Sequence, residues 1–197
     1  RPSSVSARKG RYLRRGKSYG HNRIWSREVT KKPNMSVSIG GIRMRNPVMV
    51  ASGTFGYGGE YAGLVDVNRL GALVVKGIRR DACEGNLTPR LVEVPGGLVN
   101  AIGLQGPGVE RFISDYLPFL RKCDVPVIVN IWGRTIGEYA EVAAKLDGVR
   151  GVDGLEVNIS CPNVKKGGLA FGTDPLMARR VIAAVRRETR LPQVAAP

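Results

Sequence analysis

The sequence predicts an α/β fold whose parallel β-sheet is built from repeated strand and helix units. Three observations carry this prediction. Short β-branched or aliphatic runs alternate along the chain with longer segments of helical apolar periodicity. A polar residue follows each of the four runs, and the last helical segment begins with an aspartate and a proline, which is a typical helix start. A helix after each strand returns the chain to the same end of the sheet, so parallel pairing is expected.

The four predicted strands each end at a polar side chain. They are residues 48–51 before Ser52, 73–75 before Lys76 and Gly77, 127–129 before Asn130, and 155–157 before Asn158. The predicted helices cover residues 59–67, 109–120, 136–146 and 175–188, the last with Asp174 as N-cap. Because parallel strands end at one edge of a sheet, we expect these polar residues to lie together.

A (β/α)₈ barrel explains this pattern better than a dinucleotide-binding sheet. The glycines after the first strand, which are Gly53, Gly56, Gly58 and Gly59, lack the GxGxxG spacing and a confirming acidic residue. Barrel active sites gather residues from the carboxyl ends of several strands. A barrel typically needs about 250 residues. Because residues 35–197 provide only 163, we predict about the first half of a TIM (β/α)₈ barrel.

A hairpin is predicted between the second strand and its helix. Residues 90–94 and 98–99 flank a turn with the sequence Pro-Gly-Gly. The hairpin would place five residues over the barrel mouth: Asn100, Ala101, Ile102, Gly103 and Leu104. These residues would form a platform for one face of a flat ligand, although a surface excursion without a binding role explains the spacing as well.

The candidate catalytic residue is Cys161. Pro162 prevents simple continuation of the fourth strand, so the thiol is expected at that strand's carboxyl end. Asn158 and Asn163 flank it with amides that suit a polar heterocycle. A small buried hydrophobe is the alternative interpretation of this cysteine. The single histidine, His21, lies in the N-terminal segment, so we expect a cysteine, lysine or carboxylate as base rather than a Ser/His/Asp triad.

Composition limits the remaining classes. No apolar run approaches the roughly 20 residues that span a bilayer, so no membrane segment is predicted. Cys83, Cys123 and Cys161 are far apart in the sequence. This spacing favours a reducing compartment, which we take to be the cytoplasm, and argues against disulfides and a metal site. Cys83 and Cys123 are interpreted as inert thiols.

Residues 1–34 differ sharply from the rest of the chain. They carry eleven Lys or Arg residues and one acidic residue, a net charge of +10 out of +15 for the chain. The segment has no apolar periodicity, so disorder is expected. Tyr12, Tyr19 and Trp25 could stack on bases while the cations neutralise phosphates, which leaves nucleic-acid binding as an alternative function. The start also has features of a transit peptide, but we favour translation read upstream of a natural start at Met35.

From Met35 to about residue 192 the chain resembles class 1 dihydroorotate dehydrogenases, the flavoenzymes of pyrimidine (UMP) biosynthesis. The resemblance is carried by five motifs: ASGTFGYGGEY (51–61), VVKG (74–77), NAIGLQGPG (100–108), VNIWG (129–133) and NISCPNVKKGG (158–168). FGYG and NVKKGG resemble the 1B branch. That branch implies a homodimer and a partner iron–sulfur flavoprotein, which passes electrons through FAD and a 2Fe–2S cluster to NAD. The fumarate-linked 1A branch remains an alternative.

The resemblance also implies a role for each matching residue. Cys161 would be the general base that removes the C5 proton of dihydroorotate while hydride leaves C6 for FMN. The implied substrate-binding residues are Lys76, Asn100, Ala101, Ile102, Gly103, Leu104, Asn158 and Asn163. The implied FMN-binding residues are Ser52, Lys76, Gly77, Asn130 and Asn158. Without the resemblance, Lys76 could equally be a strand-end lysine that reaches water.

The family pattern continues beyond what this chain shows. The resemblance implies a fifth strand with a lysine beside the flavin and later strands that bind the FMN phosphate, whereas residues 193–197 read QVAAP. We therefore expect a C-terminally truncated half-barrel of four strands with exposed edges and weakened FMN affinity. An inactive fragment is the alternative to the enzyme.

Overall fold

The computed structural model describes residues 33–160 and 171–196. The chain divides into two units, Arg1–Asn34 and Met35–Pro197, and every described helix and strand lies in the second. Cys161, Asn163 and almost all of the basic N-terminal segment lie outside the described residues, so the predictions made for them stay predictions.

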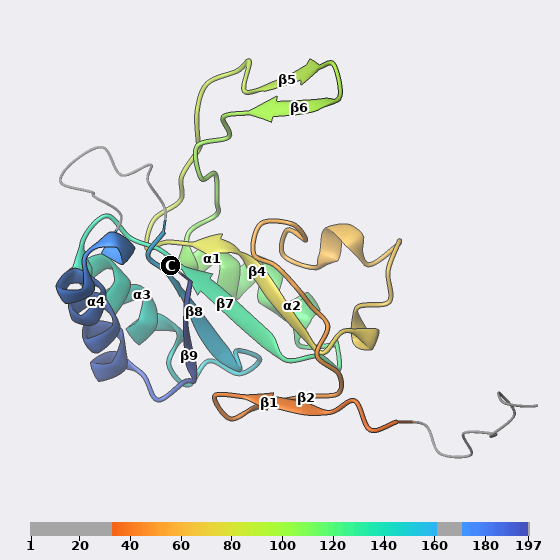
Figure 1. The fold of residues 1–197 in the computed structure, drawn as a ribbon, viewed down its shortest axis with the longest axis vertical. Helices are drawn as coiled ribbons and strands as arrows, with labels where there is room; N and C mark the ends of the chain where they lie inside the picture. Colours follow the sequence, from red (N-terminus) through yellow and green to blue (C-terminus); the bar gives the residue numbers. More distant parts are fainter. Residues whose placement is uncertain (1–32, 161–170, 197) are drawn as a thin grey trace, which may run out of the picture. The chain divides into compact units, whose positions relative to one another are not determined.

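A five-stranded parallel sheet forms the centre of the second unit (Figure 1). Its strands, in spatial order, are β3 (Met49–Val50), β4 (Ala72–Ile78), β7 (Val127–Ile131), β8 (Gly154–Asn158) and β9 (Gln193–Ala196). Each strand runs parallel to its neighbour, and their order in the sheet is their order in the chain. This is the arrangement of consecutive strands in a (β/α)₈ barrel, so the predicted fold class is confirmed.

The prediction that the sheet stops after four strands was wrong. β9 pairs along its whole length with β8, from Leu155 opposite Gln193 to Asn158 opposite Ala196. The segment lacks the lysine of the family pattern, but strand formation depends on ladder hydrogen bonds and packing rather than on that side chain. The two edges of the sheet are therefore β3 and β9.

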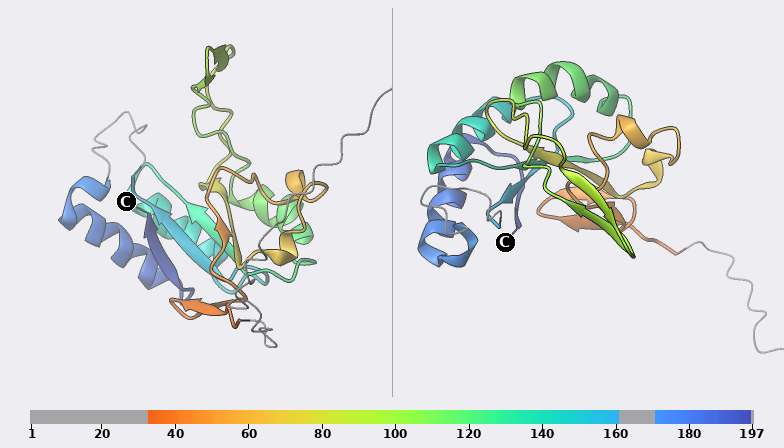
Figure 2. Two further views of the ribbon diagram at one scale, coloured as in Figure 1. Left: turned by 45° about the vertical axis from the view of Figure 1, so that its right-hand side comes forward. Right: turned by 90° about the horizontal axis from the view of Figure 1, so that it is seen from above.

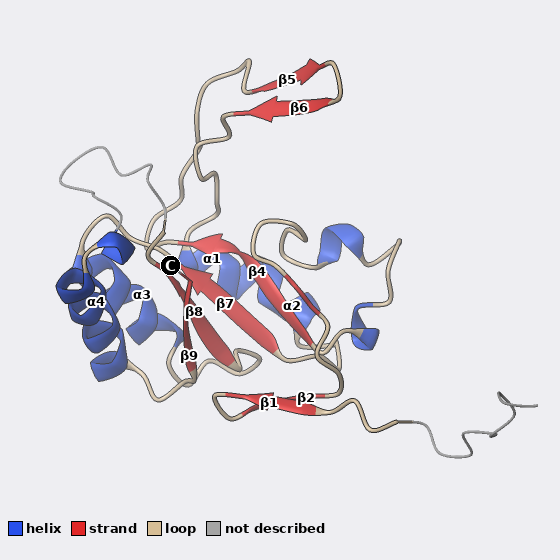
Figure 3. Cartoon of the chain, in the orientation of Figure 1, coloured by secondary structure: helices blue, strands red, loops and turns tan. Residues whose placement is uncertain are grey.

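Helices cover one face of the sheet (Figures 2 and 3). The first helical segment is continuous and consists of α1 (Val109–Arg111), the π-helical η3 (Phe112–Tyr116) and α2 (Leu117–Leu120). It is followed by α3 (Ile136–Leu146), a short 3₁₀ turn, η4 (Phe171–Thr173), and α4 (Pro175–Glu188). Asp174 caps α4 as predicted, because its Oδ1 accepts hydrogen bonds from Leu176 N at 2.8 Å and Met177 N at 3.3 Å. Three of the four predicted helices are confirmed.

The helix predicted for residues 59–67 was wrong. The segment instead contains two 3₁₀ turns, η1 (Gly59–Tyr61) and η2 (Val67–Arg69). Val67 is the only buried residue in either turn, and Leu64 between them is 82% exposed. Short helices depend on burial of an apolar face, and this segment offers almost none.

The sheet buries a different apolar cluster on each face. Leu73, Val75 and Leu155 pack toward the helices, in the larger cluster. On the opposite face, Ala72, Val74 and Ile128 are covered by Ile42 and Met44. These two residues belong to a hairpin of β1 (Val37–Ile39) and β2 (Ile42–Met44), which the sequence analysis did not predict and which lies beside the amino ends of the strands (Figure 1).

The hairpin predicted at residues 90–99 is confirmed. It consists of β5 (Leu91–Val94) and β6 (Gly97–Asn100), which pair antiparallel with Leu91 opposite Asn100. The hairpin extends from the carboxyl-end side of the sheet (Figure 1). None of the described helices has the length and apolarity that crossing a bilayer requires.

Candidate active site at the carboxyl ends of the strands

The end of β4 contains a β-bulge at Lys76 and Gly77. Val75 pairs with Val129 and Ile78 pairs with Ile131, so β4 uses one residue more than β7 over this stretch. The sequence analysis predicted that this strand ends before Lys76 and Gly77. In the structure the strand includes both residues. Bulges often re-aim side chains beside functional sites. Here the Lys76 backbone N–H donates to Gly56 O at 2.9 Å, and the Lys76 side chain lines a cleft.

The cleft has a volume of about 720 Å³, which is within the usual range of small-molecule sites. It brings together Lys76 and the whole predicted platform at the end of the hairpin. Its lining residues are Gly53, Lys76, Cys83, Gly85, Asn86, Asn100, Ala101, Ile102, Gly103, Leu104, Trp132 and Arg134. Six of the predicted substrate-binding residues therefore share one cavity.

The platform is held in a strained backbone conformation. Leu104 is a non-glycine residue with a φ of +56°, and Gly103 before it has a φ of +78°. A non-glycine residue in this region costs on the order of 1 kcal/mol or more and is typical of functional sites. Asn86 anchors the segment, because its N–H donates to Ile102 O at 3.0 Å and its Nδ2 donates to Ala101 O at 2.8 Å. The carbonyl groups of Ala101 and Ile102 are thereby fixed at the cleft wall.

Asn130 is buried inside β7 rather than following it, which corrects the predicted strand end. The residue is 1% exposed, and its Nδ2 donates to Glu156 Oε1 at 2.5 Å. Its Oδ1 is buried and accepts no hydrogen bond from any residue that the structure describes. A Cβ at Gly77 would lie 2.9 Å from this oxygen and 3.0 Å from Trp132 Cδ1. Only glycine fits at this position without displacing both neighbours.

Ser52 and Asn158 are not among the residues that line the cleft. Ser52 Oγ donates to Val75 O at 3.1 Å and so joins the chain after β3 to β4. Asn158 is the last residue of β8, which again extends one residue further than predicted. Its Oδ1 accepts from the backbone N and Oγ of Ser160, at 3.3 and 3.1 Å. These contacts shape the turn that leads to Cys161.

Sequence reasoning missed several residues of the cleft. Trp132 and Arg134 follow β7 directly, so their position after a predicted strand was an available signal. Cys83, interpreted as inert, contributes to the wall and its thiol donates to Gly103 O at 3.7 Å. Two cations, Lys76 and Arg134, line the described cleft, and no carboxylate does. The described site is therefore electropositive and suited to an anionic ligand.

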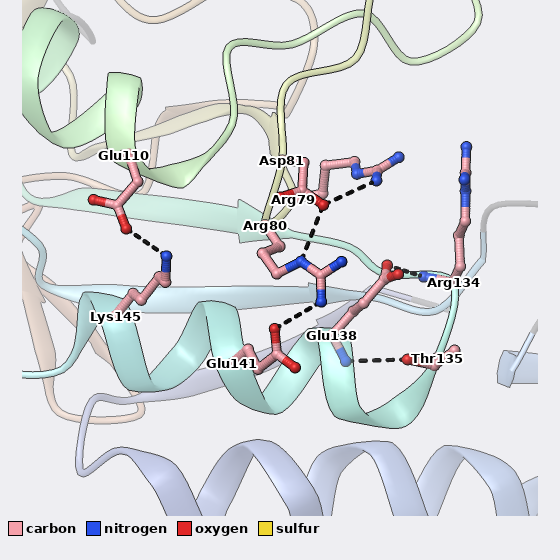
Figure 4. A network of polar contacts seen from close by, with 9 residues as sticks. All are labelled: Arg79, Arg80, Asp81, Glu110, Arg134, Thr135, Glu138, Glu141 and Lys145. Atoms are coloured by element: carbon pink, nitrogen blue, oxygen red, sulfur yellow. Dashed lines mark hydrogen bonds and ion pairs between the residues drawn. The ribbon is translucent and has the colours of Figure 1, made fainter.

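A polar network joins the end of β4 to α3 (Figure 4). Arg80 Nε donates to Asp81 Oδ2 and Nη1 donates to Glu141 Oε2, each at 3.0 Å. The hydrogen bond from Arg80 is the main reason why the pKa of Asp81 is below its ordinary value. Arg79 lies over the Trp132 ring, with its guanidinium carbon 5.4 Å from the ring centroid. These contacts support the strand ends that frame the cleft.

Two further hydrogen bonds lie at the N-terminus of α3, next to this network (Figure 4). The backbone N–H of Arg134 donates to Glu138 Oε2 at 2.8 Å, and Glu138 N–H donates to Thr135 Oγ1 at 3.2 Å. The arrangement resembles a capping box, except that Glu138 accepts from the N–H of Arg134, one residue before the N-cap Thr135. It fixes the backbone that carries Arg134, while the Arg134 side chain is exposed and faces the cleft.

Comparison with known proteins identifies related sequences over most of the chain. The family model described as dihydroorotate dehydrogenase matches residues 34–195. The "Dihydroorotate dehydrogenase B (NAD(+)), catalytic subunit" of Geobacter sp. (strain M21) is 55% identical over 164 residues, which cover 83% of this chain and 54% of the relative. The protein of the same description from Geotalea daltonii is 56% identical over 163 residues, 83% of this chain and 53% of the relative. The chain spans about half the length of the curated relatives it matches.

Proposed function

The chain belongs to the dihydroorotate dehydrogenase family, and we propose on this basis that its cleft binds FMN and dihydroorotate for oxidation to orotate. The observation that carries the proposal is the single cavity that joins Lys76 with Asn100, Ala101, Ile102, Gly103 and Leu104. These six residues come from two distant segments of the sequence. The family resemblance assigns all six to the pyrimidine substrate, and Lys76 also to the flavin.

The electrostatics of the cleft agree with an anionic substrate. Dihydroorotate carries a carboxylate, and the described cleft is lined by Lys76 and Arg134 without an acidic residue. Charge-assisted hydrogen bonds to a carboxylate are about twice as strong as neutral ones. The fixed carbonyl groups of Ala101 and Ile102 and the Asn100 amide complement these cations, because a pyrimidine ring offers both donors and acceptors.

The residues at the strand ends also fit a flavin. Asn130 Oδ1 is a buried acceptor without a hydrogen-bond partner among the described residues, and it packs against Gly77 and Trp132. Trp132 and Lys76, which precedes Gly77, both line the cleft, so this acceptor lies next to it. Ser52, Lys76, Gly77, Asn130 and Asn158 would hold FMN here, and bound FMN supplies the hydride acceptor for the reaction.

Cys161 is proposed as the general base. The described stretch of residues 33–160 ends just before Cys161 with β8 and the Asn158–Ser160 turn, at the carboxyl end of the sheet. A cysteine thiol with an ordinary pKa near ~8.5 can remove a proton near neutral pH if its surroundings favour the thiolate. In the proposed reaction, Cys161 takes the C5 proton of dihydroorotate as hydride leaves C6. Asn163 would bind the substrate.

The electron acceptor and assembly are inferred from the relatives. The names of these relatives include NAD(+) and a catalytic subunit. We propose by analogy that this protein acts as a homodimer with an iron–sulfur flavoprotein that carries FAD and a 2Fe–2S cluster and passes electrons to NAD. The alternative of nucleic-acid binding concerns the basic N-terminal segment, which lies outside the described residues.

The proposal can be tested with the full 197-residue chain. After reconstitution with FMN, anaerobic addition of dihydroorotate is expected to bleach the visible absorbance of the flavin, because hydride transfer reduces it. A chain that binds FMN without bleaching would support the inactive-fragment alternative. A chain that binds neither FMN nor dihydroorotate would refute the proposed site.

The role of Cys161 has a matched control in the same chain. Cys161→Ala is expected to lower the rate of flavin bleaching by at least about 100-fold, the usual contribution of general-base catalysis. The affinity for FMN should stay unchanged. Cys123→Ala makes the same substitution at a thiol that contacts Phe119 O at 3.7 Å and lines a separate pocket. It should leave the bleaching rate unchanged. Equal rates in both variants would exclude Cys161 as the base.

A further inference from the structure

We infer that Glu156 is a positioning residue that fixes the side-chain amide of Asn130 for hydrogen bonding to the bound flavin. Nothing in the family resemblance assigned Glu156 a role, and the inference rests on the proposed function. Asn130 and Glu156 are directly opposite each other in the parallel ladder of β7 and β8. Because strand side chains alternate between faces, Asn130 shares the face of Ile128, away from the helices.

The Glu156 carboxylate determines which way the Asn130 amide points. Asn130 Nδ2 donates to Glu156 Oε1 at 2.5 Å, across 26 residues of sequence. A carboxylate offers only acceptor oxygens, so the NH₂ group of the amide must face it. The amide oxygen is then turned to the other side, toward β4. A glutamine in place of Glu156 could pair with either end of the Asn130 amide, so it would not fix the amide orientation.

The oxygen that results is a buried acceptor with an unmet hydrogen bond. Asn130 Oδ1 has no partner in the described structure, and it lies where a Cβ at Gly77 would be 2.9 Å away. A buried polar atom without a partner carries a free-energy cost that a suitable donor removes. Lys76, which precedes Gly77, and Trp132, which packs on Gly77, both line the cleft, so a ligand bound there lies next to this oxygen and can provide that donor.

The chemistry of this acceptor matches the proposed cofactor. The oxidised isoalloxazine ring carries one N–H donor, and the ribityl chain carries hydroxyl donors. If the Asn130 amide had the reverse orientation, its NH₂ group would face the N–H and hydroxyl donors of FMN. The amide could then not accept a hydrogen bond from them. Glu156 therefore acts on FMN through Asn130, and we expect it to set the affinity without contacting the flavin.

The inference predicts a coupling that a double-mutant cycle can measure. FMN affinity of the full chain is followed by quenching of flavin fluorescence. Asn130→Ala and Glu156→Ala are each expected to weaken binding about three- to tenfold, the factor for loss of one hydrogen bond. The double variant should bind no more weakly than Asn130→Ala, within about twofold, because Glu156 has no role once the amide is absent. Additive losses would overturn the inference.

A second measurement does not depend on FMN. The Asn130 side-chain NH₂ resonance, identified by its loss in Asn130→Ala, should shift in Glu156→Gln because that glutamine can either donate or accept. Glu188→Gln is the matched control, since Glu188 is exposed at the end of α4. An unshifted Asn130 resonance in Glu156→Gln would overturn the inference. Failure of the unaltered chain to bind FMN would overturn the proposed function and Glu156's role toward FMN. Unaltered affinity in Glu156→Ala would overturn the inference alone.

Discussion

Substitution of Gly154 tests how the face of the sheet opposite the helices is filled. A Cβ at Gly154 would lie 2.6 Å from Ile42 Cδ1 and 3.2 Å from Pro192 O. The contact with Ile42 is about 1 Å shorter than an ordinary van der Waals contact between carbon atoms. In Gly154→Ala, therefore, either the Ile42 side chain or the β1–β2 hairpin has to move.

The expected cost follows from this overlap. Inserting a methyl group into a packed core costs about 1–3 kcal/mol. For a unit of this size, each kcal/mol lowers the melting temperature by about 2–4 °C. We therefore predict that Gly154→Ala lowers the melting temperature by about 4–8 °C at a cost near 2 kcal/mol, measured by circular dichroism or calorimetry on the full chain.

A compensating variant makes the prediction specific. Ile42→Val removes the Cδ1 atom that the new methyl group would meet, and by itself it should cost about 0.5–1.5 kcal/mol. The double variant Ile42→Val with Gly154→Ala should lose at least about 1 kcal/mol less than the sum of the single losses. Strictly additive losses would refute the reasoning, because they would mean that Ile42 does not pack on Gly154.

Three further predictions concern a helix start, an acid-sensitive contact and the cleft. Asp174→Ala removes the N-cap of α4 and should cost about 0.5–2 kcal/mol, measured by urea unfolding; an unchanged midpoint would contradict the cap. The pKa of Asp147 is held below its ordinary value, mainly by the hydrogen bond from Thr189 Oγ1 at 2.7 Å. This contact therefore stabilises the fold above about pH 4 and is lost as pH falls through the lower folded pKa. In Asp147→Asn the free energy of unfolding should therefore fall less steeply with decreasing pH below about pH 4. An unchanged dependence on pH in this range would contradict a stabilising role of the Asp147–Thr189 contact. Lys76→Ala should weaken orotate binding, in a titration of the full chain, by about 1.5–3 kcal/mol, the range for a charge-assisted hydrogen bond, and equal affinity would remove Lys76 from the site.

Periodic segments with local signals were predicted well. The helices Ile136–Leu146 and Pro175–Glu188 have the predicted bounds. Both show an apolar stripe, and in the second helix the cap Asp174 and a first-turn proline indicate the same start. The β5–β6 hairpin followed from its Pro-Gly-Gly turn. The β1–β2 hairpin was missed because its three-residue strands are too short to show a period, and its burial of Ile42 and Met44 depends on residues far along the chain.

The candidate site was predictable only in part for a similar reason. Strand ends and the family motifs indicated Lys76 and the platform at residues 100–104, which the cleft brings together. The sequence did not indicate Glu156, because its relation to Asn130 arises from strand register across 26 residues. The bulge at Lys76 and Gly77 was also unpredicted, since it appears only when β4 is paired with β7.

Mapping of FMN on the full chain by amide chemical shifts tests the central claim most directly. FMN should shift the backbone amides of Gly77 and of residues 100–104 at the carboxyl ends of the strands, and dihydroorotate should extend the shifts within residues 100–104. The amides of Ile42 and Met44, at the amino ends, should stay unchanged. Shifts confined to the amino ends, or absent from Gly77 and residues 100–104, would contradict the assignment of the cleft as the flavin and substrate site.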